Sequence, residues 1–227
     1  MSGKDISIKA ADGSFSAYLA TAAGKPAGGV VVIQEIFGVN SHIRSVCDRL
    51  AMAGFNALAP DLFHRSEAGV QLGYGEADFG RGFELMKALD HARALADIDA
   101  GIADLRAHGG KVAVLGFCMG GLLSFRSAAN LKPDAAVAYY GGGIANFRGE
   151  AGNIACPIQF HFGDKDHFIP LSDVDKVRAA TAGLKESEIY VYPADHGFNC
   201  DQRASYDAAA AQLAWQRSVD FLGRHLG

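Results

Sequence analysis

The chain has 227 residues, of which 49% are hydrophobic and 20% charged, with a formal net charge of −4. This balance is typical of a folded globular protein and excludes a disordered one, and the scattered basic residues leave no footprint for nucleic acid. The apolar runs are far too short to cross a membrane, and the polar N-terminus lacks the apolar core of a signal peptide. We therefore expect a cytoplasmic protein with one domain over residues 1–227.

The first segments predict an antiparallel pair of strands. Apolar residues alternate over residues 4–9 and again over 14–20, and Asp12-Gly13 between them is a hairpin turn. Further strands are expected at 30–33, 56–60, 111–115, 135–140, 158–162 and 188–192, and helices at 43–54, 84–108, 173–182 and 205–226, with a break in the second helix near 90–94. The glycine-rich stretch 63–82 predicts a long loop, and long ordered loops in compact domains often serve as lids or binding loops.

The alternation of strands and helices predicts an α/β fold. Such a fold has a mostly parallel central sheet with helices on both faces, here with an antiparallel N-terminal edge. Because ligands bind outside the carboxyl ends of parallel strands, we expect the reactive side chains in the segments that follow each strand.

Cys118 lies in the most informative of these segments, Gly116-Phe117-Cys118-Met119-Gly120-Gly121, between a short apolar run and a helical pattern. A glycine-flanked turn in this context is typical of a nucleophile elbow, with cysteine in place of serine. The helix N-terminus lowers the pKa of such a thiol and favours anions. The alternative is that Cys118 is a small buried residue without a catalytic role.

The segments after the last two strands supply partners for this cysteine. Asp166 follows one strand and His196 follows the next, so the chain order is Cys, Asp, His, as in the α/β-hydrolase fold. We interpret His196 as the general base and Asp166 as the carboxylate that orients it. The spacing alone also allows Asp164, and less readily Asp195, in that role.

The pattern favours no metal or cofactor. Cys47, Cys118, Cys156 and Cys200 form no C-x-x-C pair, which argues against a zinc ribbon or a thioredoxin-type motif, and in a reducing cytosol they stay as thiols. A metal site built from Asp164, Asp166, His167 and His196 would explain neither the elbow nor Cys118.

Several stretches, taken together, resemble the dienelactone hydrolase (carboxymethylenebutenolidase) family over nearly the whole chain. They are Gln34–Asn40, Ala59–Phe63, Gly116–Gly121, Tyr139–Gly141, Asp166–Pro170 and His196–Phe198. The resemblance implies an α/β-hydrolase fold, a triad of Cys118, His196 and Asp166, and hydrolysis of a small enol-lactone such as dienelactone to maleylacetate. It also favours Asp166 over the other carboxylates.

The resemblance assigns further roles near the nucleophile. Glu35 would contact the resting thiol and be displaced by substrate, so that the thiolate forms on demand. The backbone N–H groups of Met119 and Ile36 would form the oxyanion hole. A thioester on Cys118 would then be cleaved by water that His196 activates.

Substrate binding is where the chain departs from the family pattern. The expected arginine close after the catalytic histidine is missing, and Arg203 lies further along the chain. Arg203 and Arg81 are therefore the candidates to bind a substrate carboxylate, together with Phe37 and Tyr140 from the matching stretches. Arg44, Arg65 and Arg148 are expected at the surface.

Our principal hypothesis is a cofactor-independent carboxylic ester hydrolase that acts on a small ester or lactone, as a monomer or small homo-oligomer. A broader esterase or thioesterase is the alternative within this class. A non-catalytic module that binds small carboxylates, or a redox-sensing Cys118, are alternatives from other classes.

Overall fold

A central eight-stranded sheet organises the protein, and the computed structural model describes residues 3–227 of it. The strands are β1 (Lys4–Ala10), β2 (Gly13–Ala20), β3 (Gly29–Ile33), β4 (Asn56–Pro60), β5 (Val112–Phe117), β6 (Ala135–Tyr139), β7 (Ile158–Gly163) and β8 (Ser187–Tyr192). Their order across the sheet is β1-β2-β4-β3-β5-β6-β7-β8.

The pairing of these strands confirms the expected mixture of directions. β1 pairs with β2 and β2 with β4 in antiparallel fashion, whereas all the remaining neighbours are parallel. β3, β5, β6 and β7 are buried along their whole length, as expected of parallel strands that are covered on both faces. The carboxyl ends of the parallel strands therefore share one edge, where the site was predicted.

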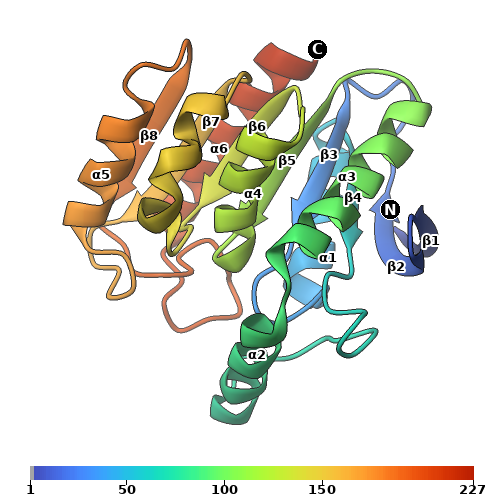
Figure 1. Ribbon diagram of the computed structural model, residues 1–227, viewed down its shortest axis with the longest axis horizontal. Coiled ribbons are helices and arrows are strands. Elements are labelled where there is room, and N and C mark those ends of the chain that lie inside the picture. The colour runs from blue at the N-terminus through green and yellow to red at the C-terminus, as the bar shows by residue number, and fades with distance from the viewer. Residues whose placement is uncertain (1–2) are drawn as a thin grey trace.

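Helices cover both faces of the sheet. They are α1 (Ser41–Met52), α2 (Glu76–Ala88), α3 (His91–Ala107), α4 (Met119–Asn130), α5 (Leu171–Thr181) and α6 (Ala208–Leu226), with a 3-10 helix η1 at Ile144–Asn153. Figure 1 shows α4 and α5 in front of the sheet and α6 behind it. Arg49 of α1 stacks on Trp215 of α6, which places α1 and α6 on the same face.

Of the two expectations for the segment before α3, one needs correction and the other is confirmed. The stretch 63–82 is not a loop throughout, because α2 begins at Glu76. α2 then ends before Leu89, and Asp90 caps α3 by accepting bonds from the N–H groups of Ala92 and Arg93, so the interruption expected near 90–94 is present. The glycines misled the prediction because Gly82 serves close packing: a Cβ there would lie 2.7 Å from the Ile36 carbonyl oxygen.

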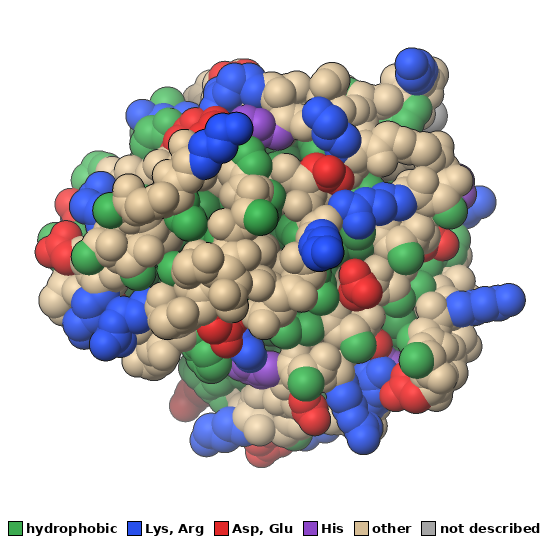
Figure 2. All heavy atoms as spheres, turned by 45° about the horizontal axis from the view of Figure 1, so that its top comes forward, with side chains coloured by type: hydrophobic (Ala, Val, Ile, Leu, Met, Phe, Trp, Pro, Cys, Tyr) green, Lys and Arg blue, Asp and Glu red, His purple; other side chains and the backbone are tan. Residues whose placement is uncertain are grey.

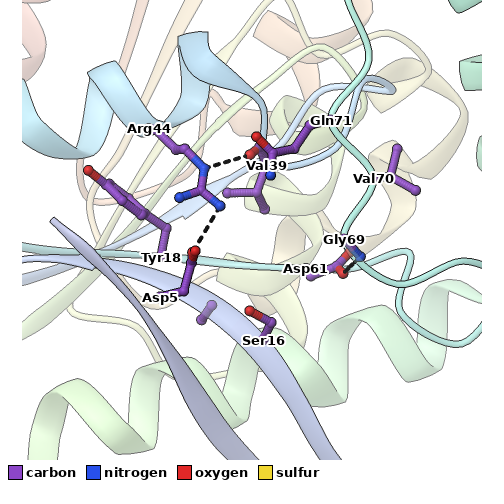
Figure 3. Close-up of a pocket in the computed structure, with 10 residues that line it drawn as sticks. Asp5, Ser16, Tyr18, Val39, Arg44, Asp61, Gly69, Val70 and Gln71 are labelled. Atoms are coloured by element: carbon purple, nitrogen blue, oxygen red, sulfur yellow. Dashed lines mark hydrogen bonds and ion pairs between the residues drawn. The ribbon is translucent and has the colours of Figure 1, made fainter.

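The remaining loop residues of this segment are fixed by Asp61, which follows β4. Its carboxylate accepts bonds from the N–H groups of Gly69 at 2.7 Å and Phe63 at 3.1 Å, and burial raises its pKa. Figure 3 shows Asp61 with Gly69 at the edge of a small cavity that Arg44 also lines. The Ala59–Phe63 stretch therefore holds a loop in place.

Basic and acidic side chains are interspersed over the face that Figure 2 shows. Within residues 3–227, no helix has both the length and the apolar character needed to cross a membrane.

Candidate active site

Cys118 occupies a strained turn between β5 and α4. Its backbone angles are φ 54° and ψ −116°, a region that non-glycine residues rarely adopt. Strain of this kind persists where the surrounding structure enforces it, and it is the hallmark of a nucleophile elbow. Because Cys118 directly precedes α4, its partly exposed side chain lies beside the free N–H groups of the first helical turn.

The glycines around Cys118 are required by close backbone contacts. A Cβ on Gly116 would lie 2.1 Å from the Gly120 carbonyl oxygen, and a Cβ on Gly120 would lie 2.2 Å from the Ile33 carbonyl oxygen. Any side chain at either position would force the strand and helix apart. The first turn of α4 is thus packed directly against the end of β3, from which Glu35 and Ile36 follow.

Asp166 and His196 meet at the carboxyl ends of β7 and β8. The His196 Nδ1 atom lies 2.7 Å from the Asp166 Oδ2 atom, and both residues are almost fully buried. The Asp166 Oδ1 atom accepts bonds from the N–H groups of Phe168 and Ile169. Asp164 is exposed, and Asp195 accepts a bond from the His196 backbone, so neither contacts the histidine ring in this way.

The surroundings of His196 favour its charged form. Burial by itself lowers the pKa of the ring, but the Cys118 sulfur and the Asp166 carboxylate outweigh burial and raise the pKa to about 10. The fully buried Tyr140, itself at a positive φ of 34°, has its ring centroid 5.1 Å from that of His196. The arrangement can hold an imidazolium beside the Cys118 sulfur.

The comparison with known proteins agrees with this geometry. A model of the dienelactone hydrolase family matches residues 15–226. The chain belongs to this family. It is 42% identical to a provisionally named carboxymethylenebutenolidase of Azospirillum brasilense over 98% of this chain and 99% of the relative, and 34% identical to the carboxymethylenebutenolidase of Pseudomonas putida over 96% and 94%.

Solved structures give the same result. A crystal structure provisionally named as a dienelactone hydrolase, from Klebsiella pneumoniae, is 34% identical and superposes with a TM-score of 0.87, covering 98% of both chains. The protein therefore has the α/β-hydrolase fold of the dienelactone hydrolase family and is a hydrolase of dienelactone hydrolase type.

Glu35 lies next to this dienelactone hydrolase elbow, in the loop after β3. It is 1% exposed, and its Oε1 atom is 3.3 Å from the Arg203 Nη1 atom. Its Oε2 atom has no hydrogen-bond partner among residues 3–227. Gln34, just before it, accepts a bond from the Leu62 N–H and so ties the loops after β3 and β4 together.

Arg203 reaches the site although it lies far along the chain from His196. Two successive turns fold the segment back, with Cys200 N–H donating to the Gly197 carbonyl and Arg203 N–H to the Cys200 carbonyl. The guanidinium then lies over Gly197, whose φ is 80° and where a Cβ would be 2.2 Å from the Arg203 Nη1 atom. Arg203 thus lies beside Glu35 at the site, although seven positions separate it from His196 in the chain.

The other predicted substrate-binding residues lie in different settings. Arg81 is exposed on α2 and pairs with Glu67 and Glu84. Phe37 is 1% exposed and packs edge-on against the rings of Tyr74 and Phe79. These aromatic residues, with ring centroids 5.5–6.0 Å from the Arg203 guanidinium, surround the arginine.

The sequence analysis did not place His42, Cys200 or Gly82 at the site. His42 and Cys200 lie beside Glu35, and both side chains are buried, as that of Glu35 is. Gly82 of α2 presses on the Ile36 backbone. His42, Cys200 and Gly82 lie outside the stretches that carry the family resemblance. Residues so far apart in the chain also give no spacing signal for a shared location.

Proposed function

We propose that this protein hydrolyses a small enol-lactone such as dienelactone, releasing maleylacetate, with Cys118 as nucleophile. His196 takes the thiol proton, and Asp166 holds the ring and stabilises the imidazolium. The observation that carries the proposal is the 2.7 Å contact between Asp166 and His196 beside a cysteine at φ 54°.

The first half of the reaction forms a thioester. The Cys118 sulfur attacks the lactone carbonyl, and the resulting oxyanion is stabilised by the backbone N–H groups of Met119 and Ile36. The close packing of Gly120 against the Ile33 carbonyl supports this pairing, because it holds the start of α4 against the loop that carries Ile36. When the tetrahedral intermediate collapses, the C–O bond of the ring breaks, and the leaving enolate takes the proton that His196 removed from the thiol, so that His196 is neutral again.

The second half releases the product. His196 removes a proton from water, the hydroxide attacks the thioester carbonyl, and the Cys118 sulfur leaves and takes that proton from His196. Glu35 acts before these steps, because a carboxylate near the thiol disfavours the thiolate by repulsion until it turns away. The ion pair between Glu35 and Arg203 supports such a movement, since it offers Glu35 a partner other than the thiol.

Arg203 is the residue we propose to bind the substrate carboxylate. Its planar guanidinium suits bidentate recognition of a carboxylate, and it is only 10% exposed beside the site. Arg81 is paired with two glutamates, so we assign it no part in binding. Recognition by one arginine, already shared with Glu35, also favours the broader small-ester hydrolase as a second function.

One experiment tests both functions. The ultraviolet loss of cis-dienelactone is followed for the wild type, Cys118→Ala and Cys118→Ser, with p-nitrophenyl acetate alongside. Rapid lactone loss that both substitutions abolish supports the lactonase. Turnover of the simple ester alone leaves the esterase, and undiminished activity in Cys118→Ala rules out the cysteine mechanism.

A further inference from the structure

Glu35, His42 and Cys200 form a buried cluster behind the proposed catalytic residues. Each offers one ligand atom, and these atoms all lie within 4.8 Å of one another. Glu35 comes from the loop after β3, His42 from the first turn of α1 and Cys200 from the segment after β8. Three parts of the chain thus direct a carboxylate, an imidazole and a thiol to one place.

Two of these side chains lack hydrogen-bond partners. The Glu35 Oε2 and His42 Nε2 atoms are buried and unsatisfied among the described residues, although Glu35 is 1% and His42 3% exposed. An unsatisfied buried polar group costs about 1 to 3 kcal/mol. Because the Glu35 Oε2 and His42 Nε2 atoms both carry this cost at one place, the site favours a ligand that accepts a lone pair from each of them.

We propose that Glu35, His42 and Cys200 bind a thiophilic divalent cation of the Zn²⁺ class. A thiolate, an imidazole and a carboxylate are the ligands that zinc takes in proteins, with a fourth position left for water. A thiolate disfavours Mg²⁺ and Ca²⁺, which select oxygen ligands. On binding, the metal–sulfur bond replaces the Cys200 S–H bond, and the proton leaves to solvent.

Charge and size both fit this assignment. One carboxylate and one thiolate balance the two positive charges of the ion. Bonds of about 2.0 to 2.3 Å in a tetrahedron separate the ligand atoms by about 3.3 to 3.8 Å. The ligand atoms, which lie within 4.8 Å of one another, therefore need to close by no more than about 1.5 Å to reach these separations.

Occupation of this site would inhibit the enzyme, a consequence that rests on the proposed function. Glu35 now pairs with Arg203 at 3.3 Å, and a cation would take that carboxylate and repel the guanidinium. Arg203 would then lose the position from which we propose that it binds substrate. Ion binding itself needs neither Cys118 nor His196.

The test is a titration of the reduced, chelator-treated full chain with ZnCl₂ by calorimetry, and with CoCl₂ by absorption spectroscopy. We expect one zinc per chain and a sulfur-to-cobalt charge-transfer band. Cys200→Ser should abolish the band and weaken zinc at least tenfold, and His42→Gln should also weaken zinc at least tenfold. The matched control Cys118→Ser, which removes the other thiol near the site, should bind as the wild type does.

Three results would overturn the site. The first is no zinc binding by the wild type, and the second is loss of zinc binding in Cys118→Ser together with its retention in Cys200→Ser. The third is binding of MgCl₂ as tight as that of ZnCl₂ in the same calorimetric titration. If Cys200→Ser fails to fold, the wild-type cobalt band and His42→Gln decide alone. Zinc should also reduce dienelactone turnover in step with occupancy while p-nitrophenyl acetate turnover changes little, and chelator should restore the lactone activity. An error in the proposed function would appear separately, as turnover by Cys118→Ser with an unchanged zinc titration.

Discussion

Asp166 uses its two carboxylate oxygens for different tasks. The Oδ1 atom accepts two backbone N–H bonds and so fixes the loop after β7, whereas the Oδ2 atom contacts the His196 ring. An Asn at this position keeps an oxygen for the loop but has no negative charge for the imidazolium. The local fold and the proposed catalytic role are therefore separable by one substitution.

We predict that Asp166→Asn lowers kcat by about 10⁴-fold, the effect of the same change in a serine protease triad. The KM should change little, because Asp166 does not contact substrate in the proposed mechanism. Steady-state kinetics with p-nitrophenyl acetate measure both kcat and KM. A variant with near wild-type kcat and an unchanged circular dichroism spectrum would contradict the role of Asp166.

Arg203 and Arg81 provide a matched pair of arginines. Arg203 is largely buried next to Glu35, and Arg81 is exposed and paired with Glu67 and Glu84. Lysine keeps the charge of arginine but cannot form a bidentate contact with a carboxylate.

Arg203→Lys should raise the KM for dienelactone at least about tenfold, which corresponds to about 1.4 kcal/mol of lost binding, while p-nitrophenyl acetate turnover changes little. Arg81→Lys should leave both reactions as they are. Steady-state kinetics on the two substrates measure these effects. Equal changes in the two variants, or in the two substrates, would argue against a carboxylate site at Arg203.

At the scale of elements, α2 acts as a support for the loop that carries Ile36. Its glycines have opposite surroundings: a Cβ on Gly82 would lie 2.7 Å from the Ile36 carbonyl oxygen, whereas nothing lies within 4 Å of a Cβ on Gly80. Helix propensity favours alanine at both positions by about 1 kcal/mol. The packing opposes alanine only at position 82, where the added Cβ would press on the Ile36 backbone.

Gly82→Ala should therefore destabilise the protein by about 1 to 3 kcal/mol, the usual effect of overpacking, and should lower kcat because the proposed oxyanion donor of Ile36 moves. Gly80→Ala should stabilise it by about 0.5 to 1 kcal/mol with unchanged kcat. Urea unfolding and ester kinetics provide the measurements. If Gly82→Ala behaved like Gly80→Ala, α2 would have no supporting role.

At the scale of the whole molecule, a buried polar network lies between the sheet and α6. The His161 Nδ1 atom is 2.8 Å from the Tyr192 hydroxyl, and its Nε2 atom is 2.8 Å from the Gln159 Oε1 atom and 3.0 Å from the Ser218 hydroxyl. Burial, helped by the charge of Arg217, lowers the pKa of His161 to about 3. The folded protein therefore holds this ring neutral.

This predicts a loss of stability in acid. As the pH falls from about 6.5 to about 3, the unfolded chain gains a proton on His161 that the folded chain does not, so stability falls by up to about 1.4 kcal/mol per pH unit. Burial lowers the pKa of His42 too. Because His42 is present both in the wild type and in a His161→Gln variant, its contribution cancels when the stabilities of these two proteins are compared. His161→Gln should be less stable at pH 7.5, and its deficit should shrink as the pH falls to 4.5. If urea unfolding gave the same difference in stability between the wild type and His161→Gln at every pH, this prediction would be contradicted.

Much of the architecture was predictable because local patterns carried it. The alternation in β1 and β2, the continuous apolar runs of β3 and β5, and the glycines of the elbow each constrain the backbone over a few residues. η1 was not predicted, and the start of α2 was placed too late, because glycines there counted as loop signals. Only the neighbouring Ile36 backbone explains why Gly82 belongs in a helix.

The sequence by itself determined the α/β class, the antiparallel edge, and the order of Cys118, Asp166 and His196, each after a strand, because these follow from short-range periodicity and turn chemistry. Only the tertiary structure decided which carboxylate contacts His196, that Arg203 folds back over Gly197 while Arg81 pairs with glutamates, and that Glu35, His42 and Cys200 share one buried place. These outcomes depend on distances between segments far apart in the chain, and such distances are set by packing of the whole sheet and its helices.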